Sequence, residues 1–369
     1  MAGIYFHIPF CKQACHYCNF HFATSLRLKE QLVKSLEKEI NLQAGYLQKQ
    51  PIETIYFGGG TPSLLSITEL ENLLKAIQKV HSVDTTAEIT LEVNPDDITV
   101  DQLKKWKDTG VNRLSIGIQS FNDTDLKWMN RAHNAKQAMV ALEHCLHYFE
   151  NCTLDLIYGL PHMRAIDWKN NIDQALQLGV PHLSCYALTV ESRTPLEKQI
   201  KLAKKSPTDP DKQAAHFELL MDWMEQAGFR QYEISNFAKP GWESKHNQSY
   251  WQGKWYLGIG PSAHSFDGIS RQWNIANNAN YIKAIEENTI PFEKEVLTTK
   301  QQTNEKIMTA LRTDLGLKLS ELASFEKTIL QAATTYIDSG HLILTNQGLQ
   351  LTRKGKCLAD GIAAALFVD

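Results

Sequence analysis

Three cysteines lie close together near the start of the chain, in the segment HIPFCKQACHYCNFHF. Cys11, Cys15 and Cys18 have the spacing Cys-x3-Cys-x2-Cys and directly follow an apolar run. Thiolates this dense on one loop can converge on one metal centre, and three of them on a four-iron cluster leave one iron open. The alternative is a zinc site with three cysteines and one histidine. Its candidate histidines are His7, His16 and His21. Because zinc knuckles usually build from C-x2-C pairs, the spacing favours the iron–sulfur cluster.

The remaining four of the seven cysteines are scattered along the chain. They are Cys145, Cys152, Cys185 and Cys357. An odd total argues against a disulfide framework, so we expect these four to be small buried apolar residues.

Glycines and polar residues follow the apolar runs at several other places. The glycines of GGGTP (58–62) would let backbone groups approach a small ligand closely. Glu92 and Gln119 end predicted strands, where barrels place ligand contacts. Arg131 and Asp155 are further charged candidates. Each residue alone has an ordinary interpretation as part of a turn or as a solvated side chain, but together they predict a ligand pocket.

A regular alternation of strands and helices would position these residues. The predicted strands cover residues 4–8, 54–57, 88–93, 113–119, 153–158 and 182–188. The predicted helices lie near residues 25–48, 66–81, 99–108, 134–149 and 167–178. Six strand–helix steps imply parallel strands joined by crossover helices. This arrangement favours a barrel or partial barrel.

The interior of this barrel is predicted to be polar. The third predicted strand alternates apolar residues with Glu88, Thr90 and Glu92, and the first and fourth strands have similar patterns. A closed, packed barrel would have apolar residues on both faces of its strands. The alternative is an antiparallel sheet with one wet face, but the intervening helices are too long for hairpins.

The chain after residue 206 has a different pattern. One helix is predicted over residues 209–227, and an aromatic, turn-rich stretch over 232–275. From residue 298, helices near 300–312 and 326–339 precede a predicted hairpin, HLIL–TNQG–LQLT. The expected fold is therefore α/β, a partial (β/α)6 TIM-like barrel with a smaller C-terminal α+β winged-helix-like unit. The expected divisions are 1–206 (barrel), 207–297 (α+β extension) and 298–369 (C-terminal unit).

Composition and charge exclude several classes of protein. The chain has 369 residues, 43% hydrophobic and 21% charged, and a net charge of −3. No apolar run is long enough to cross a membrane, and the start, MAGIYFHIPF, lacks a secretory signal. We therefore expect a cytoplasmic protein. The charge gives no case for nucleic-acid binding, so the C-terminal unit is expected to be structural or to dock a partner.

Several motifs together resemble the radical SAM superfamily. YFHIPFC…CHYC, GGGTP and DLIYGLP are similar to the oxygen-independent coproporphyrinogen III oxidase group across nearly the whole chain. The resemblance implies a 4Fe–4S cluster on Cys11, Cys15 and Cys18 with S-adenosylmethionine (SAM) on the open iron. Electron transfer to the sulfonium would cleave SAM to methionine and a 5′-deoxyadenosyl radical. The residues that the resemblance assigns to SAM are Tyr5, Tyr17, Gly59, Gly60, Thr61, Glu92, Gln119, Arg131, Asp155 and Ala187.

Three features separate the chain from a true oxidase. Phe20 stands where that enzyme has a further cysteine, and Tyr5 lies almost at the start, where the oxidase carries an extension. HNQSYW (246–251) matches the HNxxYW signature of HemW-type heme chaperones. The resemblance thus implies a chaperone without oxidase activity that passes heme to acceptor proteins, which could themselves be membrane-bound. The oxidase is the first alternative, and a zinc-stabilised interaction protein is the second.

His246 is the residue that this resemblance assigns to heme. Four tryptophans lie nearby in the sequence, namely Trp242, Trp251, Trp255 and Trp273. An aromatic wall beside an axial imidazole suits a flat porphyrin, and we expect the heme between the barrel and the C-terminal unit. His264 is the competing axial ligand. The alternative is that these aromatic residues pack an ordinary interdomain core.

Overall fold

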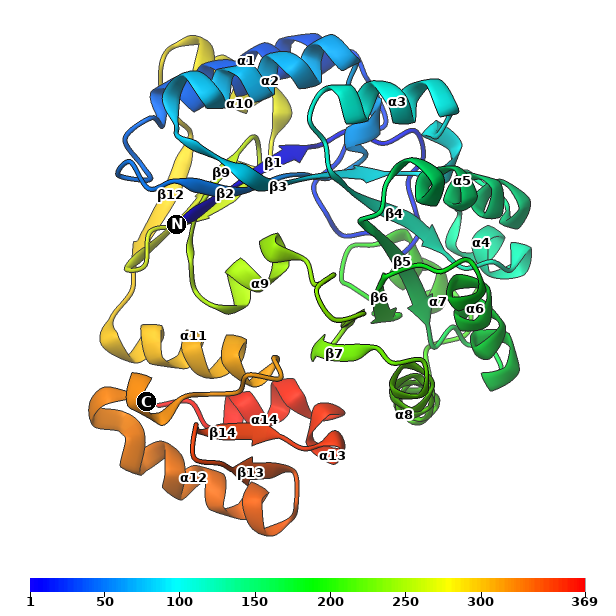
Figure 1. Cartoon of the computed structure of the whole chain (residues 1–369), viewed down its shortest axis with the longest axis vertical. Helices are drawn as coiled ribbons and strands as arrows, with labels where there is room; N and C mark the ends of the chain where they lie inside the picture. The colour runs from blue at the N-terminus through cyan, green and yellow to red at the C-terminus, as the bar shows by residue number, and fades with distance from the viewer. Residues whose placement is uncertain (369) are drawn as a thin grey trace.

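The computed structural model describes residues 1–368 and is organised around one large sheet (Figure 1). Its twelve strands have the order β12-β11-β10-β9-β1-β2-β3-β4-β5-β6-β8-β7. Asp369, the last residue of the expected C-terminal unit, lies outside the described residues. The divisions expected at residues 206 and 297 remain predictions.

Six parallel strands form the partial barrel. They are β1 (Ala2–Ile8), β2 (Ile52–Gly59), β3 (Val83–Val93), β4 (Arg113–Gln119), β5 (Cys152–Tyr158) and β6 (His182–Ala187). Each pairs in parallel with the next. The helices between them are α1 (Lys29–Leu42), α2 (Ile67–Val80), α3 (Val100–Asp108), α4 (Asp123–Met129), α5 (Ala135–Tyr148) and α6 (Ala165–Gln177). Parallel neighbours require such crossovers, and the predicted α/β fold is confirmed.

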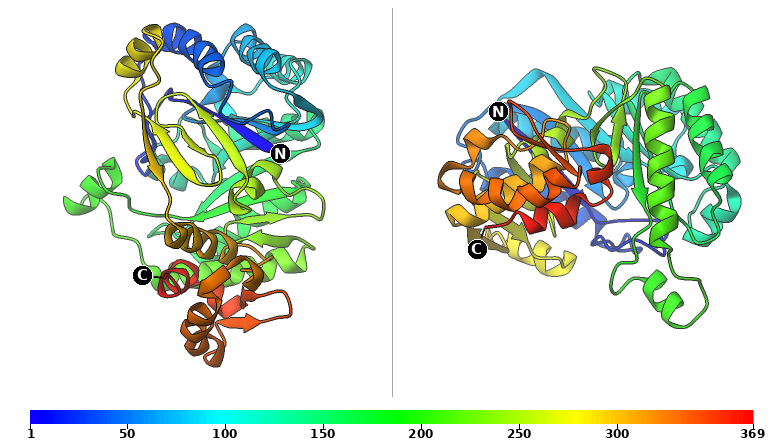
Figure 2. Two further views of the ribbon diagram at one scale, coloured as in Figure 1. Left: turned by 90° about the vertical axis from the view of Figure 1, so that its left-hand side faces the viewer. Right: turned by 90° about the horizontal axis from the view of Figure 1, so that it is seen from below.

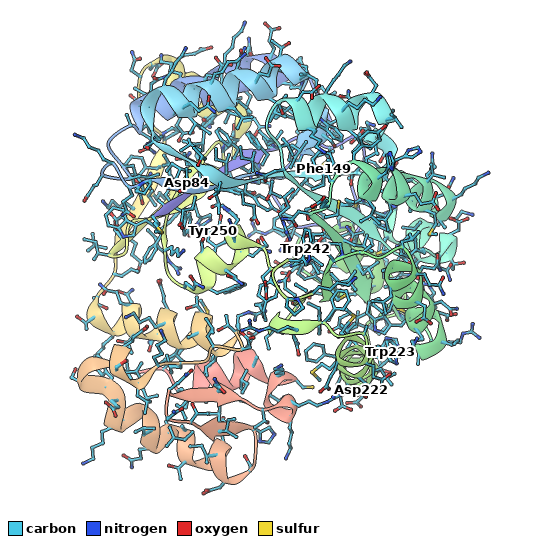
Figure 3. All side chains as sticks on the ribbon, in the orientation of Figure 1. Asp84, Phe149, Asp222, Trp223, Trp242 and Tyr250 are labelled. Atoms are coloured by element: carbon cyan, nitrogen blue, oxygen red, sulfur yellow. The ribbon has the colours of Figure 1, made fainter. Side chains whose placement is uncertain are left out.

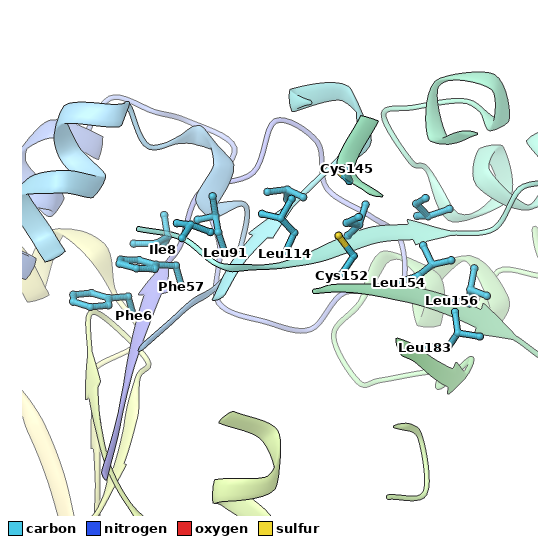
Figure 4. Close-up of a cluster of buried hydrophobic side chains, with 14 of the residues drawn as sticks. Phe6, Ile8, Phe57, Leu91, Leu114, Cys145, Cys152, Leu154, Leu156 and Leu183 are labelled. Atoms are coloured by element: carbon cyan, nitrogen blue, oxygen red, sulfur yellow. The ribbon is translucent and has the colours of Figure 1, made fainter. Parts of the chain in front are cut away.

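The two faces of the barrel strands differ as their alternating residues predict. Phe6, Ile8, Phe57 and Leu91 point outward into a core beneath the helices, where each is nearly or fully buried (Figure 4). Burying such a side chain stabilises the fold by about 1.5–3 kcal/mol. The opposite face carries polar residues of β3, β4 and β5 that line a cavity. The predicted polar interior is therefore confirmed.

Shorter strands extend the sheet at both edges. They are β9 (Trp255–Ile259), β10 (His264–Phe266), β11 (Ser270–Asn274) and β12 (Phe292–Val296) beyond β1, and β8 (Asn236–Ala238) and β7 (Arg230–Glu233) beyond β6. β9 runs parallel to β1, whereas β10–β12 are antiparallel. The other helices here are α7 (Pro195–Lys201), α8 (Pro210–Gln226), α9 (Lys245–Trp251) and α10 (Asn278–Glu286). Strands β7 to β12 were not predicted from sequence, since each has only three to five residues.

The C-terminal unit has a small core of its own and lies below the barrel in Figure 1. Its elements are α11 (Thr299–Leu311), α12 (Glu326–Asp338), β13 (Leu342–Leu344), β14 (Leu349–Leu351), α13 (Arg353–Lys356) and α14 (Ala359–Ala365). β13 and β14 form the predicted hairpin. Short 3-10 turns cover Pro62–Leu64, Pro95–Asp97, Leu319–Glu321 and Ala323–Phe325. Within residues 1–368, no helix combines the length and the apolar character that a bilayer span requires.

Candidate functional site

A cavity of about 430 Å³ opens where the parallel strands end. The carboxyl ends of parallel strands are where barrels hold their ligands. Of the residues predicted to bind cofactors, all but Tyr5 and His246 line this cavity. They are Cys11, Cys15, Cys18, Tyr17, Gly59, Gly60, Thr61, Glu92, Gln119, Arg131, Asp155 and Ala187. The structure therefore brings these residues together, while their individual roles remain predictions.

The cysteine loop follows β1 and is tied to the barrel by backbone hydrogen bonds. Cys11 N donates to Ala23 O at 3.0 Å, and His16 N donates to Met129 O at 3.0 Å. Burial raises the pKa of the Cys11 thiol and raises that of Cys18 to about 11. Without metal these two thiols are protonated at neutral pH, so iron binding would release their protons.

The histidines considered for a zinc site have other partners. His7 Nε2 lies 2.8 Å from the carbonyl oxygen of His21. The His16 ring contacts Trp128 O, and the His21 ring contacts Asn278 Oδ1. In the described part of the chain, no three His, Cys, Asp or Glu side chains are close enough to hold one metal ion. In a four-iron cluster each thiolate binds a different iron, so three cysteines can hold it without a histidine.

The glycine loop at the end of β2 packs directly against the cysteine loop. Gly60 N donates to Ile8 O at 3.0 Å, and Thr61 N donates to Phe10 O at 2.7 Å. A Cβ on Gly60 would lie 2.6 Å from Phe10 O. Gly59 has a φ of +101°, which disfavours residues other than glycine. Side chains at these positions would push the two loops apart, so the glycines are needed for the cavity to form.

Two partly buried carboxyl groups face the cavity from β3 and β5. Glu92 accepts hydrogen bonds from the Tyr56 hydroxyl at 2.8 Å and from Gly59 N at 3.2 Å. Asp155 accepts one from the Ser115 hydroxyl at 3.3 Å. Burial raises the pKa of Glu92 to about 7 and that of Asp155 to about 6. A cationic ligand would favour the ionised form of both groups.

Arg131 connects the strand ends with the cysteine loop. Its Nη2 donates to Asn94 Oδ1 and to Gly117 O, both at 2.6 Å, and its Nη1 lies 3.2 Å from Cys15 Sγ. Its Nε is buried and has no hydrogen-bond partner among residues 1–368. An unpaired buried donor costs about 1–3 kcal/mol, which an acceptor on a bound ligand would offset.

Gln119 reaches the cavity from a strained position at the end of β4. Its φ is +70°, and the pairing register of β4 with β5 shifts between Gly117 and Gln119. A left-handed residue other than glycine costs of the order of 1–3 kcal/mol and often occurs at functional sites. The strain directs this side chain toward the cavity instead of along the sheet.

Several residues of the cavity were not predicted as site residues from sequence, among them Asn94 and Tyr186. Asn94 donates to Thr61 Oγ1 at 3.0 Å while it accepts from Arg131, so it joins the glycine loop to the guanidinium. Tyr186 lines the cavity and is 43% exposed. Both stand at strand ends, in LEVNP and CYALTVE, and this position was the signal that could have found them.

His246 lies outside the cavity and is only 2% exposed. Its Nδ1 is 2.7 Å from Thr54 Oγ1, and its Nε2 is 3.0 Å from the Tyr250 hydroxyl. Its ring stacks on Tyr56 at 4.8 Å, and burial lowers its pKa to about 3. Helix α9 lies between the barrel and α11 (Figure 1), but its histidine faces the barrel. Both ring nitrogens are occupied, so His246 offers no open axial position in this conformation.

Tyr5, the other predicted residue outside the cavity, belongs to the same aromatic run. Its hydroxyl lies 3.2 Å from His7 Nδ1, and its ring stacks on Tyr56. The run continues through His246 to Tyr250, which is labelled on α9 in Figure 3. Tyr5 therefore supports β2 and α9 in the barrel interior.

The expected wall of four tryptophans stays a prediction, and the four residues lie on different elements and loops. Trp251 lies under the Arg312 guanidinium at 5.3 Å, and Trp273 stacks on His264 at 6.0 Å. Trp242 accepts a hydrogen bond from Arg113 Nη1 at 3.4 Å through its backbone carbonyl, and Trp255 lies on β9. Their closeness in sequence did not predict this, since residues 242–273 cross from α9 into the β9–β11 extension.

The scattered cysteines are placed as expected, with one exception. Cys145 and Cys152 lie in the apolar core shown in Figure 4, and Cys185 is buried as well. Cys357 is only partly buried. None of the four lines the cavity.

Two family models match the chain. Residues 5–190 match the Radical SAM superfamily, and residues 297–358 match the HemN C-terminal domain. The solved structure of coproporphyrinogen III oxidase (HemN) from Escherichia coli superimposes with a TM-score of 0.87. It covers 100% of this chain and 90% of its own at 23% identity, which shows a shared fold.

Curated relatives extend over the full length. The heme chaperone HemW of Bacillus subtilis (strain 168) is 34% identical, covering 100% of this chain and 99% of its own. The heme chaperone HemW of Lactococcus lactis subsp. lactis (strain IL1403) is 35% identical, covering 99% and 97%. A mitochondrial radical S-adenosyl methionine domain-containing protein 1 of Mus musculus is 32% identical, covering 99% and 87%. The chain therefore belongs to the radical SAM superfamily and, within it, to the HemW family.

Proposed function

We propose that this protein is a cytosolic heme chaperone that binds heme and transfers it to acceptor proteins. The observation that carries the proposal is the similarity to heme chaperones over essentially the whole of both chains, at 34% and 35% identity. That similarity includes α9, the β9–β12 extension and the C-terminal unit, and is not confined to the barrel. A heme-transfer assay would identify the acceptor proteins.

The proposal includes a 4Fe–4S cluster held by Cys11, Cys15 and Cys18, with SAM in the adjoining cavity. When bound, the cluster and SAM together supply one-electron cleavage of the sulfonium. The Arg131 guanidinium, 3.2 Å from Cys15 Sγ, lies between the cysteine loop and the strand ends, where it would also contact SAM. Two partly buried carboxyl groups, Glu92 and Asp155, would balance the positive charge of SAM. The glycine loop would allow SAM to approach the backbone closely.

For the heme we propose His264 as the axial ligand. This histidine is exposed, its ring stacks on Trp273 at 6.0 Å, and its ring has no hydrogen bond among residues 1–368. Phe266 lies on the same face of β10 two residues further on. To ligate heme, His246 would have to give up its bonds to Thr54 and Tyr250. We propose instead that His246 fixes α9 to the barrel.

Heme titration of anaerobically reconstituted protein tests this assignment. His264→Ala should weaken heme binding about tenfold or more and should change the Soret band, because the iron loses its imidazole. His246→Ala should keep the wild-type heme spectrum. Loss of the heme spectrum in His246→Ala alone, with the fold intact by circular dichroism, would return the axial assignment to His246. Unchanged spectra in both variants would remove both histidines from the proposal.

A further inference from the structure

A basic segment projects from the barrel beside the cysteine loop. It consists of α7 and the residues that follow it, 195–205, and stands out from the barrel in both views of Figure 2. It contains four lysines and a single carboxylate, Glu197. The lysines are Lys198, Lys201, Lys204 and Lys205. The chain as a whole has a net charge of −3, so the positive charge of this segment is opposite in sign to that of the whole chain.

The basic segment packs directly on the cysteine loop. Leu196 N donates to His16 O at 2.8 Å, and Lys205 Nζ lies 2.8 Å from His16 Nδ1. Lys205 also lies over the Trp128 ring at 4.1 Å. His16 directly follows Cys15 in the sequence. A protein bound to the basic segment would therefore lie close to the cysteine loop.

The outer side of the segment is open to solvent. Lys198, Lys201 and Lys204 are exposed, and Leu202 between them is 57% exposed. Lys201 pairs with Glu197 at 2.6 Å, whereas Lys198 and Lys204 make no ion pair with any residue from 1 to 368. Charges around a small apolar patch are typical of sites that steer a transient partner of opposite charge.

We propose that the basic segment is the docking surface for an acidic one-electron carrier protein, which reduces the cluster. This inference rests on the proposed cluster. One electron leaves the carrier and enters the cluster, so the carrier is oxidised by one electron and the cluster is reduced by one, with no bond or proton exchanged. The contact with His16 favours such a partner over a nucleic acid, because it places the bound protein next to the cysteines.

The first test measures binding without the cluster. The probe is an acidic flavodoxin in its oxidised form, titrated by calorimetry into the metal-free chain. Reversal of charge at Lys198, Lys201 and Lys204 to Glu should weaken binding about tenfold or more at low ionic strength, and added salt should weaken wild-type binding. The matched control reverses three other exposed lysines, Lys49, Lys300 and Lys327, and should bind as the wild type does. Equal affinity in both triple variants would overturn the proposal.

The second test uses the reconstituted chain and stopped-flow absorbance. Reduction of the cluster by fully reduced flavodoxin should slow about tenfold or more in the Lys198/Lys201/Lys204 variant. Reduction by dithionite, a small ion that needs no docking surface, should keep its wild-type rate. Equal slowing with both reductants would overturn the proposal, since the cluster itself would be altered. If no cluster assembles, the cofactor proposal fails, while the flavodoxin titration still decides whether the basic segment binds an acidic carrier.

Discussion

The three thiols of the cysteine loop are the residues on which the cofactor assignment depends. They line one cavity, and each lies within a loop tied to the barrel by backbone hydrogen bonds. The other four cysteines lie elsewhere, three of them in the apolar core. Substitution of one of these four cysteines is therefore a control for substitution of a predicted cluster ligand.

Replacement of Cys11, Cys15 or Cys18 by Ala should abolish the broad iron–sulfur absorbance after anaerobic reconstitution, because a cluster with two ligands is held poorly. Iron and sulfide analysis per chain would measure the loss. Cys357→Ala is the matched control, since this cysteine is also partly buried but lies outside the cavity. An equal loss of iron in Cys357→Ala would show that the ligands are assigned wrongly.

Glu92 should make SAM binding depend on pH. Its pKa is about 7 in the ligand-free protein, so below that value the group is neutral and SAM must displace a proton to bind beside a carboxylate. The affinity for SAM should therefore rise as the pH increases from 5.5 through 7 to 8, by up to about tenfold per unit below the pKa.

Calorimetry on reconstituted Glu92→Gln should show weaker SAM binding and a smaller rise with pH, with iron content unchanged. Arg131→Ala and Asp155→Ala should also weaken SAM binding while they keep the cluster. Glu71→Gln, an exposed substitution on α2, is the control. Wild-type affinity in all three cavity variants would contradict the pocket assignment.

Much of this cavity could be predicted from sequence, because strand ends and glycine loops have fixed places in a barrel. Gly60, Glu92, Gln119 and Asp155 all follow from that rule and from the family motifs. The environment of His246 could not be predicted, since it depends on Thr54, which is 192 residues away in the sequence. Local sequence carries no information about such a partner.

Helix α9 is held to the barrel by a buried carboxylate. Glu88 accepts hydrogen bonds from Lys245 N at 3.1 Å and from His246 N at 3.0 Å, and it lies 4.0 Å from Arg113. Glu88 is 4% exposed and Arg113 is 1% exposed. The negative charge at the start of α9 complements the helix dipole, and it also balances the buried guanidinium.

Glu88→Ala should lower the free energy of unfolding by about 3–5 kcal/mol, because it leaves Arg113 buried without its carboxylate partner. Glu88→Gln should cost less, about 1–3 kcal/mol, since the amide oxygen still accepts hydrogen bonds. Urea unfolding of the metal-free protein would measure both. Glu53→Ala, which breaks a partly exposed pair with Lys254, should cost at most about 1 kcal/mol. Equal destabilisation by Glu53→Ala and Glu88→Ala would contradict this account of α9.

The elements themselves were predicted unevenly. The six barrel strands and five of the helices between them have clear periods of two and of 3.6 residues, and these periods predicted them. Helix α4, which has only seven residues, was missed. The strands β7 to β12 have three to five residues and no such pattern, as in β12, where all five residues are exposed. These strands are defined by their hydrogen bonds to neighbouring strands, which the periodicity of the sequence does not predict.

Arg312 connects the C-terminal unit to the rest of the molecule. It lies 3.0 Å from Glu233 Oε1, a nearly buried carboxylate on β7, and its guanidinium lies over the Trp251 ring on α9. It also pairs with Asp360 at 2.6 Å. One side chain thus contacts the sheet edge, α9 and the C-terminal unit at once.

Arg312→Ala should loosen the C-terminal unit from the barrel and lower the free energy of unfolding by about 1–3 kcal/mol, since Glu233 loses its partner. Limited proteolysis should then cut the chain more readily between β12 and α11. Arg353→Ala is the control, because its pairs with Asp222 and Glu225 are largely exposed. Unchanged proteolysis in Arg312→Ala would show that other contacts hold the two parts together.

At the scale of the whole molecule, we propose that the protein carries heme and does not oxidise a porphyrinogen. Phe20, 66% exposed at the mouth of the cavity, stands where the resembled oxidases have a further cysteine. The most direct measurement mixes heme-loaded, reconstituted protein with an apo heme protein, such as apomyoglobin, and follows the Soret band. A parallel anaerobic assay supplies SAM, reductant and coproporphyrinogen III. We predict transfer of heme and no protoporphyrinogen. Absence of heme binding together with sustained porphyrinogen turnover would contradict the account.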